Sequence, residues 1–142
     1  MSADRRTAFV DTNILVYAHD RTAGERHDKA RELVRDLWAS RRGVLSTQVL
    51  QELYVTLRRK LAQPLSPSEA RSIVDDFRRW KVVVNDDHSL IAASETEERF
   101  GISFWDALVI QAAITAGADV VYSEDMNDGQ DYDGVKVVNP FL

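Results

Sequence analysis

Short apolar runs alternate with longer helical segments along this chain, and no other feature of the sequence constrains the fold as strongly. The runs at residues 7–10, 43–46, 82–84, 119–122 and 135–138 have the composition of β-strands. Most of the intervals between them repeat apolar residues at helical spacing. Strands that alternate with helices form a mainly parallel sheet with helices on both faces. We therefore predict an α/β fold of three layers with a mainly parallel five-stranded sheet.

Capping and turn residues mark the ends of helices in the intervals between the predicted strands. Ser66 and Glu69 have the spacing of a capping box, and Gly101 is suited to the end of a helix. The interval 123–134 is rich in Asp, Asn and Gly, which predicts a loop and not a helix. Since the chain has 142 residues and contains neither a repeat nor a linker-like segment, we expect a single domain spanning residues 1–142.

Composition excludes several classes of protein. The absence of cysteine rules out a disulfide scaffold, a thiolate zinc site and a cysteine nucleophile. No apolar run is long enough to span a bilayer and no signal peptide is evident, so we expect a cytoplasmic protein without membrane contact. A net charge of -5 argues against binding nucleic acid through bulk positive charge. Basic clusters such as residues 58–60 are either solvated helix ends or groups that steer phosphate.

Four carboxylates fall at the ends of predicted strands or early in a following helix. Asp11 follows the first strand and Asp125 follows the fourth. Glu52 lies one to two turns into the helix after the second strand, and Asp106 lies near the start of a helix that is apolar on all sides. The C-terminal edge of a parallel sheet is where such folds bind ligands, and these positions can converge there.

Each of these acids also has a purely structural explanation. Asp11 could cap the next helix, and Ser103 with Asp106 fits a capping box. Glu52 lies outside the apolar stripe of its helix, so periodicity alone predicts a solvated side chain. The combination favours a site, because clustered carboxylates repel one another unless a cation lies between them. Mg²⁺ or Mn²⁺ would fill this role and would support hydrolysis of a phosphodiester.

Four stretches together resemble the PIN-domain ribonucleases, and in particular the VapC-type toxins of type II toxin-antitoxin pairs. They are "FVDTNILVYAHD", "STQVLQELYVTL", "SFWDALVIQAA" and "VVYSED", in this order over nearly the whole chain. The resemblance implies a PIN-like fold and a metal-dependent endoribonuclease that cleaves RNA with Mg²⁺ or Mn²⁺. It also implies a cognate antitoxin protein and a homodimer.

The resemblance assigns roles to the four acids. Asp11 and Asp106 would be the principal metal ligands, and Glu52 would orient or deprotonate the attacking water and could also contact the metal. Asp125 would complete the centre directly or through water, although Glu124 is an alternative for this fourth position.

Three further polar residues have supporting roles under the same resemblance. Asn13 and Ser123 would hold the acids by hydrogen bonding, and Asp128 is a candidate for a similar, more distant role.

Histidines and aromatic residues offer weaker signals. We expect surface or capping roles for His19, His27 and His88. The larger aromatic side chains are more typical of a core or an interface than of base stacking; they are Trp38, Trp80, Trp105, Tyr17 and Tyr54.

Two other functions compete. A haloacid-dehalogenase-like phosphotransferase would use Asp11 as a nucleophile, but it needs a second aspartate where Asn13 stands and a later lysine, and neither is evident. A PIN-like module that only binds RNA or protein is the other competitor, and the presence of all four acids argues against it.

Overall fold

A six-stranded sheet forms the middle layer of the computed structural model, which describes residues 5–142. Its strands are β1 (Ala8–Val10), β2 (Gly43–Ser46), β3 (Lys81–Val83), β4 (Val120–Tyr122), β5 (Asp131–Tyr132) and β6 (Val135–Val138). They lie in the order β3-β2-β1-β4-β6-β5, and all neighbouring pairs are parallel except β5 with β6. The mainly parallel sheet is confirmed, with β1 and β4 buried near its centre.

The prediction of five strands was wrong by one. β5 lies inside the segment 123–134, which we expected to be a loop throughout, and it pairs antiparallel with β6. Asp133 and Gly134 join the two strands with φ of 53° and 92°. Positive φ at both central residues is what a two-residue type I′ hairpin requires, and Asp-Gly is a preferred pair there. Burial of Tyr132 in the core holds the short strand in place.

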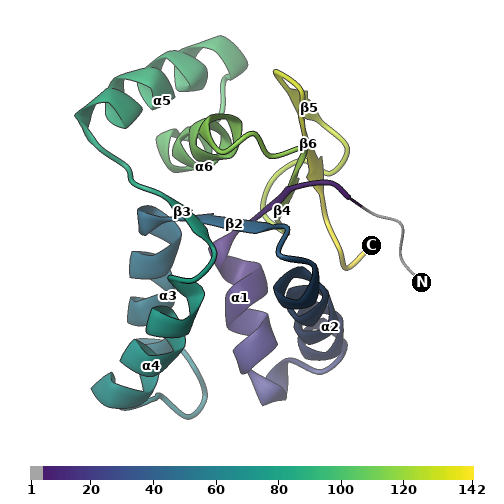
Figure 1. Ribbon diagram of the computed structural model, residues 1–142, viewed down its shortest axis with the longest axis vertical. Helices are drawn as coiled ribbons and strands as arrows, with labels where there is room; N and C mark the ends of the chain where they lie inside the picture. Colours follow the sequence, from purple (N-terminus) through teal and green to yellow (C-terminus); the bar gives the residue numbers. More distant parts are fainter. Residues whose placement is uncertain (1–4) are drawn as a thin grey trace.

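Helices cover both faces of the sheet. They are α1 (Thr12–His19), α2 (Glu25–Ser40), α3 (Thr47–Arg59), α4 (Pro67–Phe77), α5 (Asp87–Phe100) and α6 (Phe104–Thr115), with a 3-10 helix η1 (Arg21–Ala23). Figure 1 shows α1 to α4 on one side of the sheet and α5 with α6 on the other, which confirms the three layers. Among residues 5–142, none of the helices combines the length and the apolar character that a membrane span needs.

Helix ends follow the local signals in the sequence. Ser66 and Glu69 form a reciprocal capping box at the start of α4, and Gly101 ends α5 with φ of 65°. Buried residues lie all around α6, as its uniformly apolar sequence predicts. Trp38 and Trp80 pack with Phe77 in an aromatic cluster, with ring centroids 5.2 to 5.6 Å apart.

The register of the sheet brings two polar residues together. Val10 of β1 pairs with Tyr122 of β4 in a parallel ladder. The next residue of each strand, Asp11 and Ser123, therefore leaves the same edge of the sheet side by side. The other neighbour of β1 is β2. The strands that follow β1 in sequence and those that follow β4 therefore lie on opposite sides of the β1–β4 pair, which makes this pair the topological switch point of the sheet. Ligand clefts of open α/β sheets form at such points.

Candidate active site

A cleft of about 650 Å³ lies beside these strand ends and collects all four predicted acids. They reach it from four separate segments of the chain: the end of β1, helix α3, the first turn of α6 and the loop after β4. The acids that line the cleft are Asp11, Glu52, Asp106 and Asp125. The convergence predicted from their positions in the sequence is therefore present in the structure.

Asp11 is the most buried of the four, with 9% of its surface exposed. One carboxylate oxygen accepts a hydrogen bond from the backbone N–H of Thr12 at 2.8 Å, and the other accepts from the Ser123 hydroxyl at 2.7 Å. Burial raises the pKa of Asp11 to about 6, although both hydrogen bonds favour the charged form. The negative charges of Glu52 and Asp125 raise this pKa further. Asp11 thus caps α1 and also carries uncompensated charge into the cleft.

Glu52 is exposed on α3 and faces the cleft. The hydroxyl of Thr12 donates a hydrogen bond to one of its carboxylate oxygens at 2.8 Å. The helical pattern correctly predicts an exposed side chain, but it does not reveal that the exposed face lines a cleft. One oxygen of Glu52 is held, and the side chain remains accessible to water.

Asp106 lies in the first turn of α6 and is half-buried. Its backbone N–H donates to the Ser103 hydroxyl at 3.1 Å, so half of the expected capping box is formed. Burial raises the pKa of Asp106, the hydrogen bond with Ser103 lowers it, and the charge of Asp125 raises it. A second acid of the cleft therefore favours either a proton or a nearby cation.

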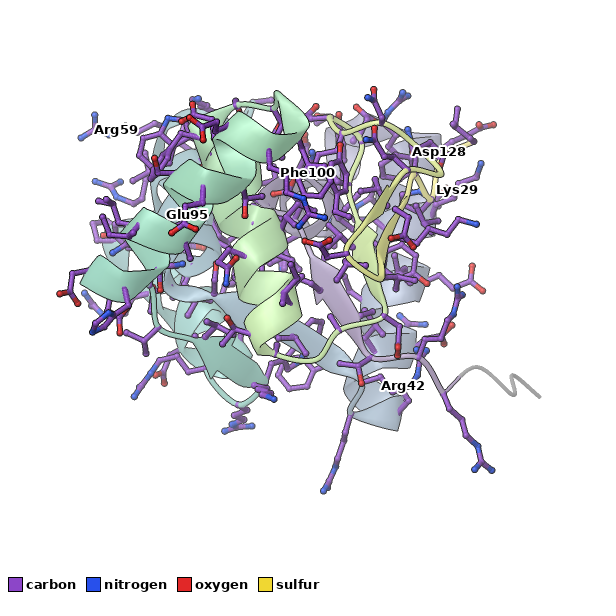
Figure 2. All side chains as sticks on the ribbon, turned by 90° about the horizontal axis from the view of Figure 1, so that it is seen from above. Lys29, Arg42, Arg59, Glu95, Phe100 and Asp128 are labelled. Atoms are coloured by element: carbon purple, nitrogen blue, oxygen red, sulfur yellow. The ribbon has the colours of Figure 1, made fainter. Side chains whose placement is uncertain are left out.

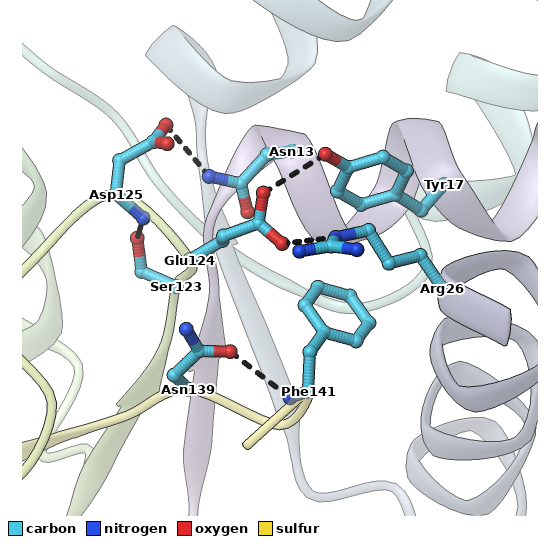
Figure 3. A network of polar contacts seen from close by, with 8 residues as sticks. All are labelled: Asn13, Tyr17, Arg26, Ser123, Glu124, Asp125, Asn139 and Phe141. Atoms are coloured by element: carbon cyan, nitrogen blue, oxygen red, sulfur yellow. Dashed lines mark hydrogen bonds and ion pairs between the residues drawn. The ribbon is translucent and has the colours of Figure 1, made fainter. Parts of the chain in front are cut away.

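Asn13 and Ser123 form hydrogen bonds with acids of the cleft, and Figure 3 shows their contacts with Asp125. The Asn13 amide donates to Asp125 at 2.8 Å. The Ser123 hydroxyl accepts from the backbone N–H of Asp125 at 3.2 Å while it donates to Asp11. Among the residues described, the buried carbonyl oxygen of Asn13 has no hydrogen-bond partner. One acceptor of this cleft residue is therefore buried and unsatisfied.

Glu124 supports the loop and does not line the cleft. Its carboxylate pairs with Arg26 at 2.6 Å and accepts from the Tyr17 hydroxyl at 2.9 Å. Phe141 packs against both partners, edge-on to Tyr17 at 5.4 Å and beneath the Arg26 guanidinium at 5.4 Å (Figure 3). This clamp anchors the residue that precedes Asp125. Sequence reasoning missed it, because Arg26 and Glu124 are 98 residues apart and no local pattern links them.

Asp128 does not line the cleft with the four acids, and its more distant supporting role stays a prediction. It is exposed, and its carboxylate accepts from the backbone N–H of Asn139 at 2.7 Å. Figure 2 shows it at the outer side of the loop. Asp128 thus joins the loop after β4 to the segment that follows β6.

The basic cluster at residues 58–60 divides into three different environments. Arg58 donates to the backbone carbonyl of Leu65 at 3.1 Å and so holds the turn after α3. Arg59 projects outward at the edge of the molecule (Figure 2). Only Lys60 of the three lines the cleft. A phosphate-steering role can therefore be assigned to one residue of the cluster at most.

Trp105 does not take the first of the two expected places, a core or an interface, and the second stays a prediction. It is 63% exposed and lines the cleft next to Asp106, so it is not a core residue. The histidines behave as expected: His19 and His27 are hydrogen-bonded to the backbone carbonyls of Leu15 and Tyr17.

The donor set fits a hard divalent cation bound through few protein ligands. Within residues 5–142, no three acidic or histidine side chains are close enough together to form a preformed coordination site for one metal ion. Mg²⁺ does not need such a site, because it usually keeps several waters and takes one or two carboxylates together with substrate phosphate. The raised pKa of Asp11 and the unpartnered oxygen of Asn13 are both consistent with such an ion.

Comparison with known proteins identifies a family whose sequence profile matches most of this chain. The profile of the PIN domain matches residues 8–128. The fold resembles that of VapC20 from Mycobacterium tuberculosis, a Sarcin-Ricin loop cleaving toxin, with 23% identity, a TM-score of 0.64 and coverage of 84% of this chain and 91% of that one. A toxin-antitoxin complex from Klebsiella pneumoniae contains a chain with 15% identity, a TM-score of 0.69 and coverage of 94% and 97%.

A DNA-bound VapBC complex from Salmonella typhimurium gives 20% identity, a TM-score of 0.63 and coverage of 93% of this chain and 96% of that one. A search of curated proteins finds no match. At these identities the structural comparisons establish a shared fold.

Proposed function

Because the chain belongs to the PIN domain family, we propose that it is a single-domain, metal-dependent endoribonuclease and the toxin of a type II toxin-antitoxin pair, acting in the cytoplasm. The observation that carries this proposal is the convergence of four carboxylates from distant segments in one cleft. The toxins and toxin-antitoxin complexes among the similar structures support it. Membership in this family removes the haloacid-dehalogenase-like alternative.

In the proposed reaction, Asp11 and Asp106 hold Mg²⁺ or Mn²⁺, and Asp125 completes the site directly or through water. When bound, the ion supplies positive charge for the phosphate and lowers the pKa of a water molecule. Glu52 is the acid best suited to orient the attacking water or accept its proton, because it is exposed to the cleft and fixed by Thr12.

Ser123 and Asn13 act through the acids and do not react. The Ser123 hydroxyl contacts both Asp11 and the backbone of Asp125, so it fixes the spacing between these two residues. Asn13 orients the Asp125 carboxylate from the first turn of α1. Groups that orient metal ligands in this way contribute about 10- to 100-fold to metal affinity or activity.

The cognate partner is an antitoxin that places a cationic group in the cleft. An arginine matches this requirement, because its guanidinium binds carboxylates through paired hydrogen bonds. Such a residue would neutralise the same acids that bind the metal and would also block RNA. We further propose that the active toxin is a homodimer, as the family resemblance implies.

The decisive experiment is RNA cleavage by the purified chain with Mg²⁺, with Mn²⁺ and with excess EDTA. Cleavage should require a divalent ion and should be lost in Asp106→Asn, which removes one cleft charge at constant volume. Glu95→Gln, a matched loss of charge at an exposed position of α5, should cleave normally. Binding of RNA without cleavage under every condition would favour the non-catalytic module, and full cleavage in EDTA would reject the metal mechanism.

A further inference from the structure

We propose that Trp105 is a stacking platform for an unpaired base of the RNA substrate, close to the scissile phosphate. The inference rests on the proposed ribonuclease function and adds one residue that binds the substrate. It follows from one exposed indole that lines the same cleft as the acids.

Trp105 is the exposed one among the three tryptophans. Trp80 is 8% exposed and Trp38 is partly buried in the aromatic cluster, whereas Trp105 is 63% exposed. Leaving this much apolar surface in water forgoes the free energy that burial of an indole would provide. A ligand with a flat apolar face would recover part of it.

The indole is held by a rigid support. Trp105 lies in the first turn of α6, and the ring of Phe104 packs edge-on against it with centroids 5.3 Å apart. Its neighbour in sequence is Asp106, so the ring and the carboxylate are presented from the same helical turn. Both side chains line the same cleft, so one strand of RNA can stack a base on the ring and place a phosphate at the acids.

The remaining lining of the cleft suits a nucleotide. Val55 on α3 adds a second exposed apolar surface, and Lys60 adds a cation for a phosphate. Bases in a duplex are already stacked, so only a single strand or a loop can offer a free face.

The test compares Trp105→Ala, Trp105→Phe and an apolar control, Ile91→Ala, which is 59% exposed on α5 outside the cleft lining. The substrate is a short single-stranded RNA that spans a mapped cleavage site. Stacking on an aromatic ring predicts that Trp105→Ala raises KM by about 5- to 150-fold with little change in kcat. Trp105→Phe should retain most of the affinity, and Ile91→Ala should match the wild type.

An abasic substrate separates stacking from a general structural effect. Removing the base on one side of the scissile phosphate should weaken the wild type and should cost Trp105→Ala little more, because the shared contact is already absent. Equal losses in the two proteins would overturn the proposal. A change in oligomeric state caused by Trp105→Ala would also overturn it and would identify an interface between copies.

Failure of the ribonuclease proposal would be visible separately, as absence of cleavage by the wild type. Stacking would still be decided by tryptophan fluorescence. Binding of a single-stranded oligoadenylate should quench emission in the wild type and not in Trp105→Phe, since Trp38 and Trp80 lie in the core cluster. Equal quenching in the two proteins would reject Trp105 as the platform.

Discussion

Replacing Asp11 by asparagine distinguishes a helix cap from a metal ligand, because the substitution keeps the shape of the side chain and removes its charge. Asparagine and aspartate cap helices about equally well. If Asp11 served only α1, the D11N variant would resemble the wild type in every respect. If its charge belongs to a cation site, the metal-free protein should become more stable while activity is lost.

The size of the stability change follows from the pKa of Asp11, which is about 6 in the fold against an ordinary value of 3.8. Since each unit corresponds to about 1.4 kcal/mol, ionised Asp11 costs the fold about 3 kcal/mol above pH 6. The folded pKa is the higher one, so the metal-free wild type should gain stability as pH falls from about 6 to about 4.

Replacing Asp11 by asparagine removes the energetic cost of the buried charge, but it weakens one of the two hydrogen bonds that the carboxylate accepts. Its amide offers only one accepting oxygen, whereas the carboxylate of Asp11 accepts from both Thr12 and Ser123. That loss is about 1 kcal/mol. We therefore expect metal-free D11N to be about 2 kcal/mol more stable than the wild type at pH 7, a rise in Tm of about 5 to 10 °C. Near pH 4 the advantage should disappear.

The cleavage rate should move in the opposite direction. Loss of a principal ligand should lower it by several orders of magnitude, because metal activation lowers the reaction barrier by several kcal/mol. Mg²⁺ should raise the Tm of the wild type and have little effect on that of D11N. Growth inhibition on expression should vanish with the activity.

Urea unfolding in EDTA at several pH values, Mg²⁺ titration and cleavage rates on one preparation test all of these outcomes. Glu95→Gln is the control for loss of an exposed charge. The reasoning is refuted if D11N cleaves RNA like the wild type, or if the metal-free wild type does not gain stability relative to D11N between about pH 6 and 4. Lost cleavage with a lowered Tm would show that Asp11 acts as a structural residue.

Three further predictions concern the surroundings of the acids. Ser123→Ala removes the hydroxyl shared by Asp11 and Asp125, and Mg²⁺ affinity measured by calorimetry should fall by about 10- to 100-fold. Glu124→Gln breaks the ion pair with Arg26 but keeps an acceptor for the Tyr17 hydroxyl; the cleavage rate should fall by up to about tenfold, and an unchanged rate would limit the clamp to stability. Lys60→Ala should reduce the slope of log affinity for RNA against log salt by about one, whereas Arg59→Ala should leave that slope unchanged.

The fold could be predicted largely from local sequence signals. Strands 43–46 and 135–138 are apolar runs between helices, and the capping box at Ser66 needs only residues close in sequence. The hairpin at β5 was missed although its signal is also local: Asp133-Gly134 separates Tyr132 from an apolar strand. The run of acidic residues around it favoured a solvated loop, and a strand of two residues offers too little alternation to detect.

The site was less visible in the sequence, because its geometry depends on contacts between distant segments. Asp11 could be predicted, since its place after a strand fixes the edge of the sheet on which it lies. Glu52 could not be predicted from periodicity, because an exposed helix face and a cleft wall have the same pattern. Trp105 was missed for the converse reason, since α6 is apolar on all sides and its sequence does not show which apolar residues remain exposed.

In the loop after β4, the acid that lines the cleft is held by a neutral donor, whereas its neighbour in sequence is held by a cation. Glu124 and Asp125 are adjacent, yet Glu124 is paired with Arg26 and Asp125 is held by the neutral amide of Asn13. Neutral donors orient carboxylates without cancelling their charge, so the acids of the cleft can still bind a cation. Either a divalent ion or an arginine of the proposed antitoxin could fill this role. Because both would neutralise the same acids, Mg²⁺ and the antitoxin should compete, and raising the Mg²⁺ concentration should weaken inhibition by a peptide that carries that arginine.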